Sequence, residues 1–447
     1  MFKIQKEIIR FIQAGFLGML VLLGMSTEAQ AVPSFARQTG ENCVACHTSF
    51  PELTPFGREF KLNGYTLGEA KWFPFSGMGM ISSTSIKKNE NADGGKLMPK
   101  QNAIEIDQLS VFAAGKVNDH VGGFVQFTYA NYPGAEGDPQ HHSAIDNTDL
   151  RIIQNFTLAD KNLLVGLTLN NNPSVQDVWN TTPAWGYPFY SPGIIGTPGA
   201  TAATALDGMF AQTAAGLGAY VWWDRHLYAE LSMYGNANRT LGFLSAGTRL
   251  DPNNSLVGHN NPYWRLAWNE EWGANSLMVG TYGMRASISR VDAPGLIDTY
   301  TDTAVDAQYQ YISDPSIVTV QATFIHEKQS TPGNQYLNEN SDPSVSVNAN
   351  NSLNVFRGKV SYLYDRTYGA TLGFNNITGS NDSGLYGDNG KPNSRFYTME
   401  VNYNYNPQVR FLAQYTYYDK LDQAAMGGAS QSAKDYNTLM LATWFAF

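Results

Sequence analysis

The sequence predicts an all-β protein, an antiparallel transmembrane β-barrel of about 16 strands, preceded by a small helical segment. Three observations support the barrel. Apolar and polar residues alternate over much of the chain, and the connections between the alternating stretches are in turn short and long. The chain also ends in LMLATWFAF, with a terminal Phe447, as the last strands of bacterial outer-membrane barrels typically do.

Residues 1–31 have the features of a secretory signal. Lys3, Lys6 and Arg10 form a basic start, residues 14–25 are apolar, and residues 29–31 read Ala-Gln-Ala, a cleavage pattern. The apolar core is shorter than the ~20 residues of a membrane helix. We expect a cleaved signal peptide, export through the Sec pathway and a final location in the bacterial outer membrane.

The composition is unusual for a soluble protein. Charged residues make up 15% of the chain and aromatic residues 13%, whereas about 25% of a typical chain is charged. The net charge of −9 argues against nucleic acid as a partner. No stretch after the signal holds 18 consecutive apolar residues, so we expect no membrane-spanning helix there. The aromatic side chains instead suit alternate positions on the strands of a membrane β-barrel.

Residues 32–75 contain the only two cysteines, in ENCVACHTSF (41–50). Cys43, Cys46 and His47 form C-x-x-C-H, the spacing of c-type haem attachment, in which two thiols hold the ring and the histidine is the proximal iron ligand. A disulfide would leave His47 unexplained, and zinc would need further ligands that this segment lacks. We therefore expect one covalent haem c in a small cytochrome segment, with a short helix near residues 55–63 ended by Gly64.

The distal iron ligand is less well specified. Met78 lies in FPFSGMGMISS, where the cytochrome segment meets the first strand, and is our candidate because His/Met ligation is common in cytochromes c. Packing of apolar surface is the competing interpretation of Met78. Met98, His120 and His226 are weaker candidates.

Residues 76–447 alternate with the period of a β-strand. Val318, Val320 and Phe324, for example, alternate with polar residues, as in a barrel with lipid outside and polar groups inside. A soluble β-sandwich would alternate in the same way. The sixteen expected strands are 77–87, 103–116, 119–131, 147–158, 162–171, 208–223, 226–236, 263–271, 276–291, 301–312, 316–327, 352–365, 367–377, 394–405, 408–419 and 435–447.

The connections give an orientation. Short joins occur at 118, 159–161, 224–225, 272–275, 313–315, 366 and 406–407, and the gaps between them are long and polar. Short turns of such barrels face the periplasm and long loops face outward. The cytochrome segment therefore starts on the periplasmic side, where it either hangs below the barrel or folds up into its lumen.

Three stretches resemble the fused monohaem cytochrome–porin family of the bacterial outer membrane, best known from iron-oxidising bacteria. They are FARQTGENCVACHTSFPELTPFGREFKLNGYTL (35–67), FPFSGMGMIS (73–82) and NNNPSVQDVWNTTPAWGYPF (170–189). The resemblance implies a monohaem cytochrome in or at the mouth of the barrel, with Cys43, Cys46 and His47 as the haem residues.

The resemblance also implies a function. It predicts electron transfer from an extracellular donor, most simply Fe(II), through the haem to periplasmic carriers such as soluble cytochromes. That activity is like an iron:cytochrome oxidoreductase and unlike hydrolytic or group-transfer catalysis. A passive porin with a haem plug, another donor and outward electron flow are the alternatives.

Overall fold

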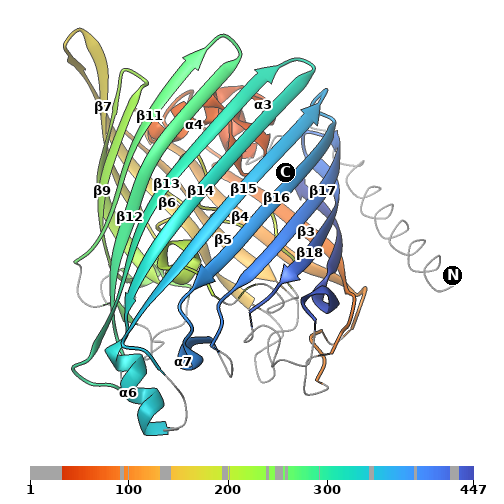
Figure 1. The fold of residues 1–447 in the computed structure, drawn as a ribbon. Coiled ribbons are helices and arrows are strands. Elements are labelled where there is room, and N and C mark those ends of the chain that lie inside the picture. Colours follow the sequence, from red (N-terminus) through yellow and green to blue (C-terminus); the bar gives the residue numbers. More distant parts are fainter. Residues whose placement is uncertain are drawn as a thin grey trace, which may run out of the picture.

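The computed structural model describes residues 33–90, 95–98, 100–130, 142–193, 200, 202–237, 241–246, 255–256, 260–290, 292–341, 347–386, 390–422 and 432–447. The predicted signal peptide lies outside these residues. One antiparallel sheet of 17 strands dominates, and one of them, β10 (Ser255–Leu256), has only two residues. The other sixteen close into a barrel, because the last strand pairs with the first strand of the sheet (Figure 1).

All sixteen predicted barrel strands are present. They are β3 (Phe75–Ile86), β4 (Ile104–Asn118), β5 (Val121–Ala130), β6 (His142–Leu158), β7 (Lys161–Asn170), β8 (Ala214–Trp223), β9 (Leu227–Asn236), β11 (Asn261–Trp272), β12 (Asn275–Ser289), β13 (Ile297–Ser313), β14 (Ser316–Ser330), β15 (Asn350–Tyr364), β16 (Tyr368–Gly379), β17 (Ser394–Asn406), β18 (Val409–Lys420) and β19 (Thr438–Ala446).

Two predicted strand starts were wrong. β8 begins at Ala214 and not at 208, because the preceding residues form a turn, η1 (Ala205–Met209), that packs against β12 and β13 inside the barrel. β6 begins at His142, five residues early, because it continues to pair with β5 beyond an irregularity between Val125 and Phe127.

The two faces of the barrel wall differ as the alternation predicts. On β13, Asp302 and Asp306 are 2% and 5% exposed, whereas Val305 between them is 55% exposed. Large apolar side chains are exposed around the whole wall, as on Leu217, Leu372 and Val401. Such an apolar outer surface needs lipid to cover it, so the soluble-sandwich alternative fails.

Connections of two or three residues join the strands at one end of the barrel, at every predicted short join. The other end carries the longer connections, which include α6 (Pro332–Ser341) and α7 (Ser383–Tyr386) (Figure 1). Two short 3₁₀ turns, η2 (Gly242–Leu244) and η3 (Ala433–Tyr436), also lie in long connections. By the rule used above, the short-turn end faces the periplasm.

The segment before β3 folds into the barrel, towards the short-turn end (Figure 1). We call residues 33–74 the plug. It contains α2 (Pro33–Thr39), α3 (Cys43–Cys46), β1 (His47–Ser49), β2 (Glu52–Leu53) and α4 (Pro55–Leu62). The predicted helix is confirmed as α4, whose N-cap Thr54 accepts a hydrogen bond from the Gly57 N–H and whose end is followed by Gly64 at φ 62°.

A second segment also enters the lumen. We call residues 171–193, which follow β7, the inner loop; 13 of its first 18 residues, Asn171 to Pro188, are buried. The plug and the inner loop together occupy the inside of the barrel.

In the part of the chain described, no helix has the length and apolarity to span a membrane.

Candidate functional site

The C-x-x-C-H motif lies on the plug, at the edge of a cavity in the lumen. Cys43 and Cys46 begin and end α3, and His47 follows as the first residue of β1. The carbonyl of Cys46 accepts a hydrogen bond from the Thr54 N–H at 2.9 Å, which ties this turn to the start of α4. α4 approaches so closely that a Cβ on Gly57 would collide with the Cys46 carbonyl oxygen.

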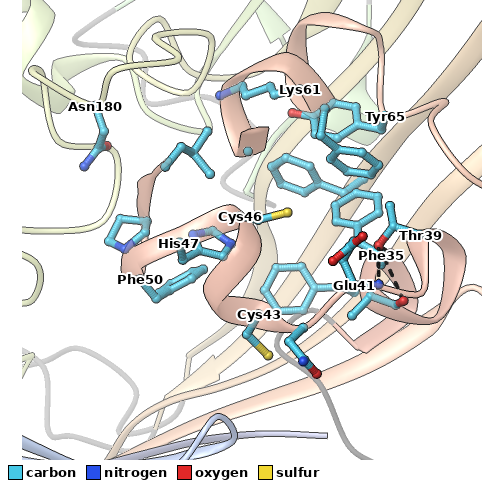
Figure 2. Close-up of a pocket in the computed structure, with 18 of the residues that line it drawn as sticks. Phe35, Thr39, Glu41, Cys43, Cys46, His47, Phe50, Lys61, Tyr65 and Asn180 are labelled. Atoms are coloured by element: carbon cyan, nitrogen blue, oxygen red, sulfur yellow. Dashed lines mark hydrogen bonds between the residues drawn. The ribbon is translucent and has the colours of Figure 1, made fainter. Parts of the chain in front are cut away.

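The cavity beside this motif encloses about 930 Å³, counting the part open to solvent. Its lining is mostly apolar, as is typical of ligand pockets. Aromatic side chains from the plug, the barrel wall and the inner loop line it: Phe35, Phe50, Phe60, Tyr65, Phe112, Phe124 and Trp185. Figure 2 shows the Cys43–His47 turn on one side and Phe35 and Tyr65 on the other.

His47 is suited to bind a metal. Its Nδ1 is buried without a hydrogen bond to any described residue, and the backbone carbonyls of Pro51 and Glu52 face the ring. Burial lowers the pKa of His47 to about 4. The imidazole is therefore neutral near pH 7, which is the form that ligates iron.

The two cysteines are thiols and do not form a disulfide in the structure. Burial raises the pKa of Cys46 to about 12, and Cys43 is 7% exposed. Two thiols and an adjacent neutral imidazole beside a large apolar cavity fit a covalently attached haem of the c type. Cys43 and Cys46 would hold its ring, and His47 would ligate its iron.

Met78 does not line this cavity. It is 3% exposed on β3 and lines a neighbouring cavity of about 420 Å³ together with Met80 and Trp444. Phe50 and Trp185 line both cavities, and Phe50 lies 5.5 Å from the His47 ring and 5.7 Å from that of Trp444, between ring centroids.

The weaker distal candidates lie elsewhere. Met98 packs against Ile86 at the long-loop end of β3. His120 and His226 lie at short turns, where their Nδ1 atoms contact the carbonyls of Ile153 and Asn269 at 3.1 and 2.9 Å. None of the three lines the His47 cavity.

Buried polar contacts hold the plug to the barrel wall. Arg58 on α4 donates to Gln308 at 3.0 Å, Gln310 at 2.7 Å and Ser276 at 2.8 Å, all on β12 and β13. Further contacts reach other strands: Glu52 with Lys359 at 2.9 Å, Tyr65 with Asp149 at 2.7 Å, and Tyr220 with the Leu62 carbonyl at 2.6 Å. The plug is thus attached on several sides.

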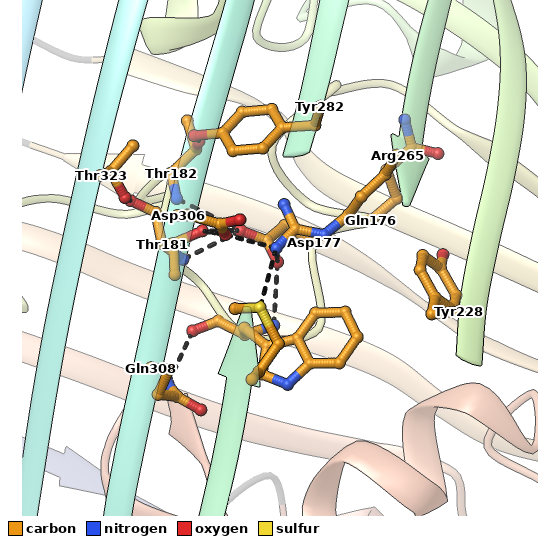
Figure 3. Close-up of polar contacts among 12 residues, drawn as sticks. Gln176, Asp177, Thr181, Thr182, Tyr228, Arg265, Tyr282, Asp306, Gln308 and Thr323 are labelled. Atoms are coloured by element: carbon orange, nitrogen blue, oxygen red, sulfur yellow. Dashed lines mark hydrogen bonds and ion pairs between the residues drawn. The ribbon is translucent and has the colours of Figure 1, made fainter. Parts of the chain in front are cut away.

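The inner loop is held by a buried ionic network (Figure 3). Arg265 on β11 lies 2.5 Å from Asp306 on β13 and 3.7 Å from Asp177 of the inner loop. Its guanidinium stacks over Trp179 at 5.1 Å. The Asp177 carboxylate accepts hydrogen bonds from the backbone of Trp179 and Thr181, each at 2.9 Å, which fixes the loop beside the cavity.

Sequence reasoning missed the inner loop's contribution to the site. Asp177, Asn180 and Trp185 line the cavity, yet we assigned this stretch no chemical role. Its only signal was the motif at 170–189, which carried part of the resemblance.

Comparisons with known proteins give structural likeness only. No family model matches the chain, and no curated protein matches it. Similar solved structures include OmpT of Vibrio cholerae in its trimer form (12% identity, 83% of this chain and 98% of that one, TM-score 0.47). Others are OmpF of Salmonella typhi in complex with daunomycin (12%, 83% and 97%, 0.46) and the channel DcaP of Acinetobacter baumannii (11%, 83% and 96%, 0.46). OmpT and DcaP are described as an outer membrane protein and an outer membrane channel.

Proposed function

We propose that this chain is an outer-membrane electron-transfer protein with one c-type haem attached inside its barrel. In this proposal it belongs with the fused cytochrome–porin family, takes electrons from an extracellular donor, Fe(II), and passes them to periplasmic carriers such as soluble cytochromes. The supporting observation is the C-x-x-C-H motif beside an aromatic cavity within the lumen. A haem bound there would supply a one-electron redox centre.

The surrounding residues support this role by their placement. Cys43 and Cys46 would anchor the group at the periplasmic end, and the aromatic lining would surround it with apolar side chains. The plug and the inner loop fill space that a wide diffusion channel would need to keep open. This arrangement favours electron transfer over the passive-porin alternative.

Met78 remains the distal-ligand candidate under this proposal. Phe50 and Trp185 line both the Met78 cavity and the His47 cavity, so the two cavities are neighbours.

The test uses the haem-loaded protein in liposomes that enclose a soluble c-type cytochrome. Fe(II) added outside should reduce the enclosed cytochrome, and a variant with both cysteines replaced by serine should not support this reduction. Solute flux measured on the same liposomes should be low. Rapid flux without cytochrome reduction would reject electron transfer and favour the porin, and reduction by other outside donors alone would reject Fe(II).

A further inference from the structure

The pairing of β3 with β4 has an irregularity that lies closer to the extracellular end of the barrel than the His47 cavity does. In the pairing of β3 with β4, Met80 is opposite Gln108 and Ile81 is opposite Ile106, so Asp107 is an extra residue in a β-bulge. Bulges re-aim side chains and are common beside functional sites. Asp107 is 5% exposed, so its side chain does not lie on the exposed outer face of the barrel.

The Asp107 carboxylate is incompletely satisfied. Neither oxygen makes a hydrogen bond to a described residue, although the Ser82 hydroxyl, the Tyr190 hydroxyl and the Gly193 backbone N–H face it. No lysine or arginine within the described ranges forms an ion pair with it. A buried carboxylate without a counter-charge is costly, and a bound cation would supply that counter-charge.

Other oxygen ligands surround Asp107. Ser82 and Thr84 on β3 are 1% and 3% exposed, and both hydroxyls lack a hydrogen-bond partner among the described residues. Glu105 is paired directly with Ser82, so it projects from the same face of the sheet, and its charge acts on Asp107. Two carboxylates and the Ser82 hydroxyl form an all-oxygen set, which hard divalent cations prefer. Thr84 lies two residues beyond Ser82 along β3, too far from Asp107 to share one cation with it.

We propose that Glu105, Asp107 and Ser82 bind a divalent cation in the extracellular third of the lumen. That this cation is Fe²⁺ in the working protein rests on the proposed function. The described residues contain no group of three or more His, Cys, Asp or Glu able to hold a metal. The site proposed here has two carboxylates, Glu105 and Asp107, and is completed by the Ser82 hydroxyl.

The position of this site relates it to the cavities below. Gln108 and Tyr190, which adjoin Asp107, line the Met78 cavity, and that cavity shares Phe50 and Trp185 with the His47 cavity. Ser110, which pairs with Met78, is three residues along β4 from Asp107, or about 10 Å at ~3.3 Å per residue. A cation at Asp107 would therefore be separated from the haem cavity by a methionine- and aromatic-lined space.

Asp146 on β6 provides a matched control. It also lies near the extracellular end of its strand, but its carboxylate is satisfied by Thr128 at 2.7 Å, the Asn147 N–H at 2.8 Å and Gln212 at 3.0 Å. Asp146→Asn removes one lumen carboxylate, as Asp107→Asn does, without removing a ligand of the proposed site.

The experiment is a Mn²⁺ titration of the haem-loaded protein, followed by electron paramagnetic resonance. Mn²⁺ is a stable probe that lies next to Fe²⁺ in the affinity order for a given ligand set. Wild type and Asp146→Asn should bind one Mn²⁺ with equal affinity, and Asp107→Asn should bind it at least tenfold more weakly. Equal binding by Asp107→Asn, or no binding by wild type, would overturn the site.

Two further readouts separate the cation's identity from the fold and from the proposed function. Heat-modifiable migration on gels should be equal in all variants, and Ser82→Ala provides a milder change should Asp107→Asn fail to fold. Anaerobic Fe²⁺ should displace the bound Mn²⁺; failure to do so would reject Fe²⁺ as the cation. Mn²⁺ binding without haem reduction by outside Fe(II) would reject the proposed function and leave the cation site standing.

Discussion

The plug and the inner loop both fill the lumen and share one cavity, but different forces hold them. The plug turns aromatic side chains towards the cavity and attaches to the wall through many separate polar contacts, such as those of Arg58. The inner loop depends on one concentrated network around Arg265. Loss of one plug contact should therefore destabilise only part of the plug. Loss of the Arg265 charge should destabilise the whole inner loop.

The largest expected effect falls on the plug's chemistry. Replacing Cys43 and Cys46 together with serine should abolish covalent haem, because no thiol remains to form a thioether bond. Haem staining after denaturing electrophoresis measures this. His47→Ala is the companion variant, which should keep covalent haem but change its visible spectrum. Covalent haem in the double-serine protein would contradict the assignment of the motif.

The next largest effect should follow loss of the Arg265 charge. Arg265→Met leaves Asp177 and Asp306 buried without their cation, and breaking a buried pair costs about 3–5 kcal/mol. Urea unfolding in detergent measures the loss. Lys161→Met removes an exposed partner of Asp224 and should change stability by no more than ~1 kcal/mol. Equal losses in the two variants would show that the inner loop does not depend on this network.

A smaller effect is expected at the plug's anchor. Arg58→Met removes hydrogen bonds to Gln308, Gln310 and Ser276 and leaves these acceptors buried, a cost of about 1–3 kcal/mol. Hydrogen exchange should speed up in residues 43–62 and stay unchanged in the barrel strands. Lys71→Met, at an exposed ion pair with Glu69, is the control. Faster exchange throughout the barrel would mean that the plug is part of one cooperative unit.

The smallest structural effect is expected at Met78. Met78→Ala should lower the haem midpoint potential and remove a near-infrared methionine-ligation band, because a distal methionine raises the potential. Met80→Ala, which enlarges the same cavity, should leave the band in place. An unchanged spectrum in Met78→Ala would restrict Met78 to packing.

The sequence was most informative about the wall and least informative about its contents. Period-two alternation identified all sixteen strands, because lipid outside and a polar lumen impose opposite demands on successive side chains. The same rule could not distinguish Arg265 from any other inward polar residue, because its importance comes from Asp177, 88 positions earlier in the chain. The sequence also could not show that the inner loop lies in the lumen. A long polar connection has a similar composition whether it faces water outside the barrel or folds into it.

The site divides in the same way. Cys43, Cys46 and His47 could be proposed as haem residues from their spacing, because c-type haem attachment uses those groups side by side. The cavity they face was not predictable, because its lining comes from the plug, β4, β5 and the inner loop. Asp107 gave no signal either, because a bulge is a property of strand pairing and not of one strand.

The pairing of β19 with β3 has a consequence for assembly. β3 follows the plug directly, and β19 is the final strand of the chain. The seam can therefore form only once β19 is available to pair, and β19 lies far later in the chain than the plug. Once β19 pairs with β3, the barrel wall surrounds the plug. Any later covalent change to the plug must then take place through an open end of the barrel. The plug can leave through the wall only if β3 and β19 separate.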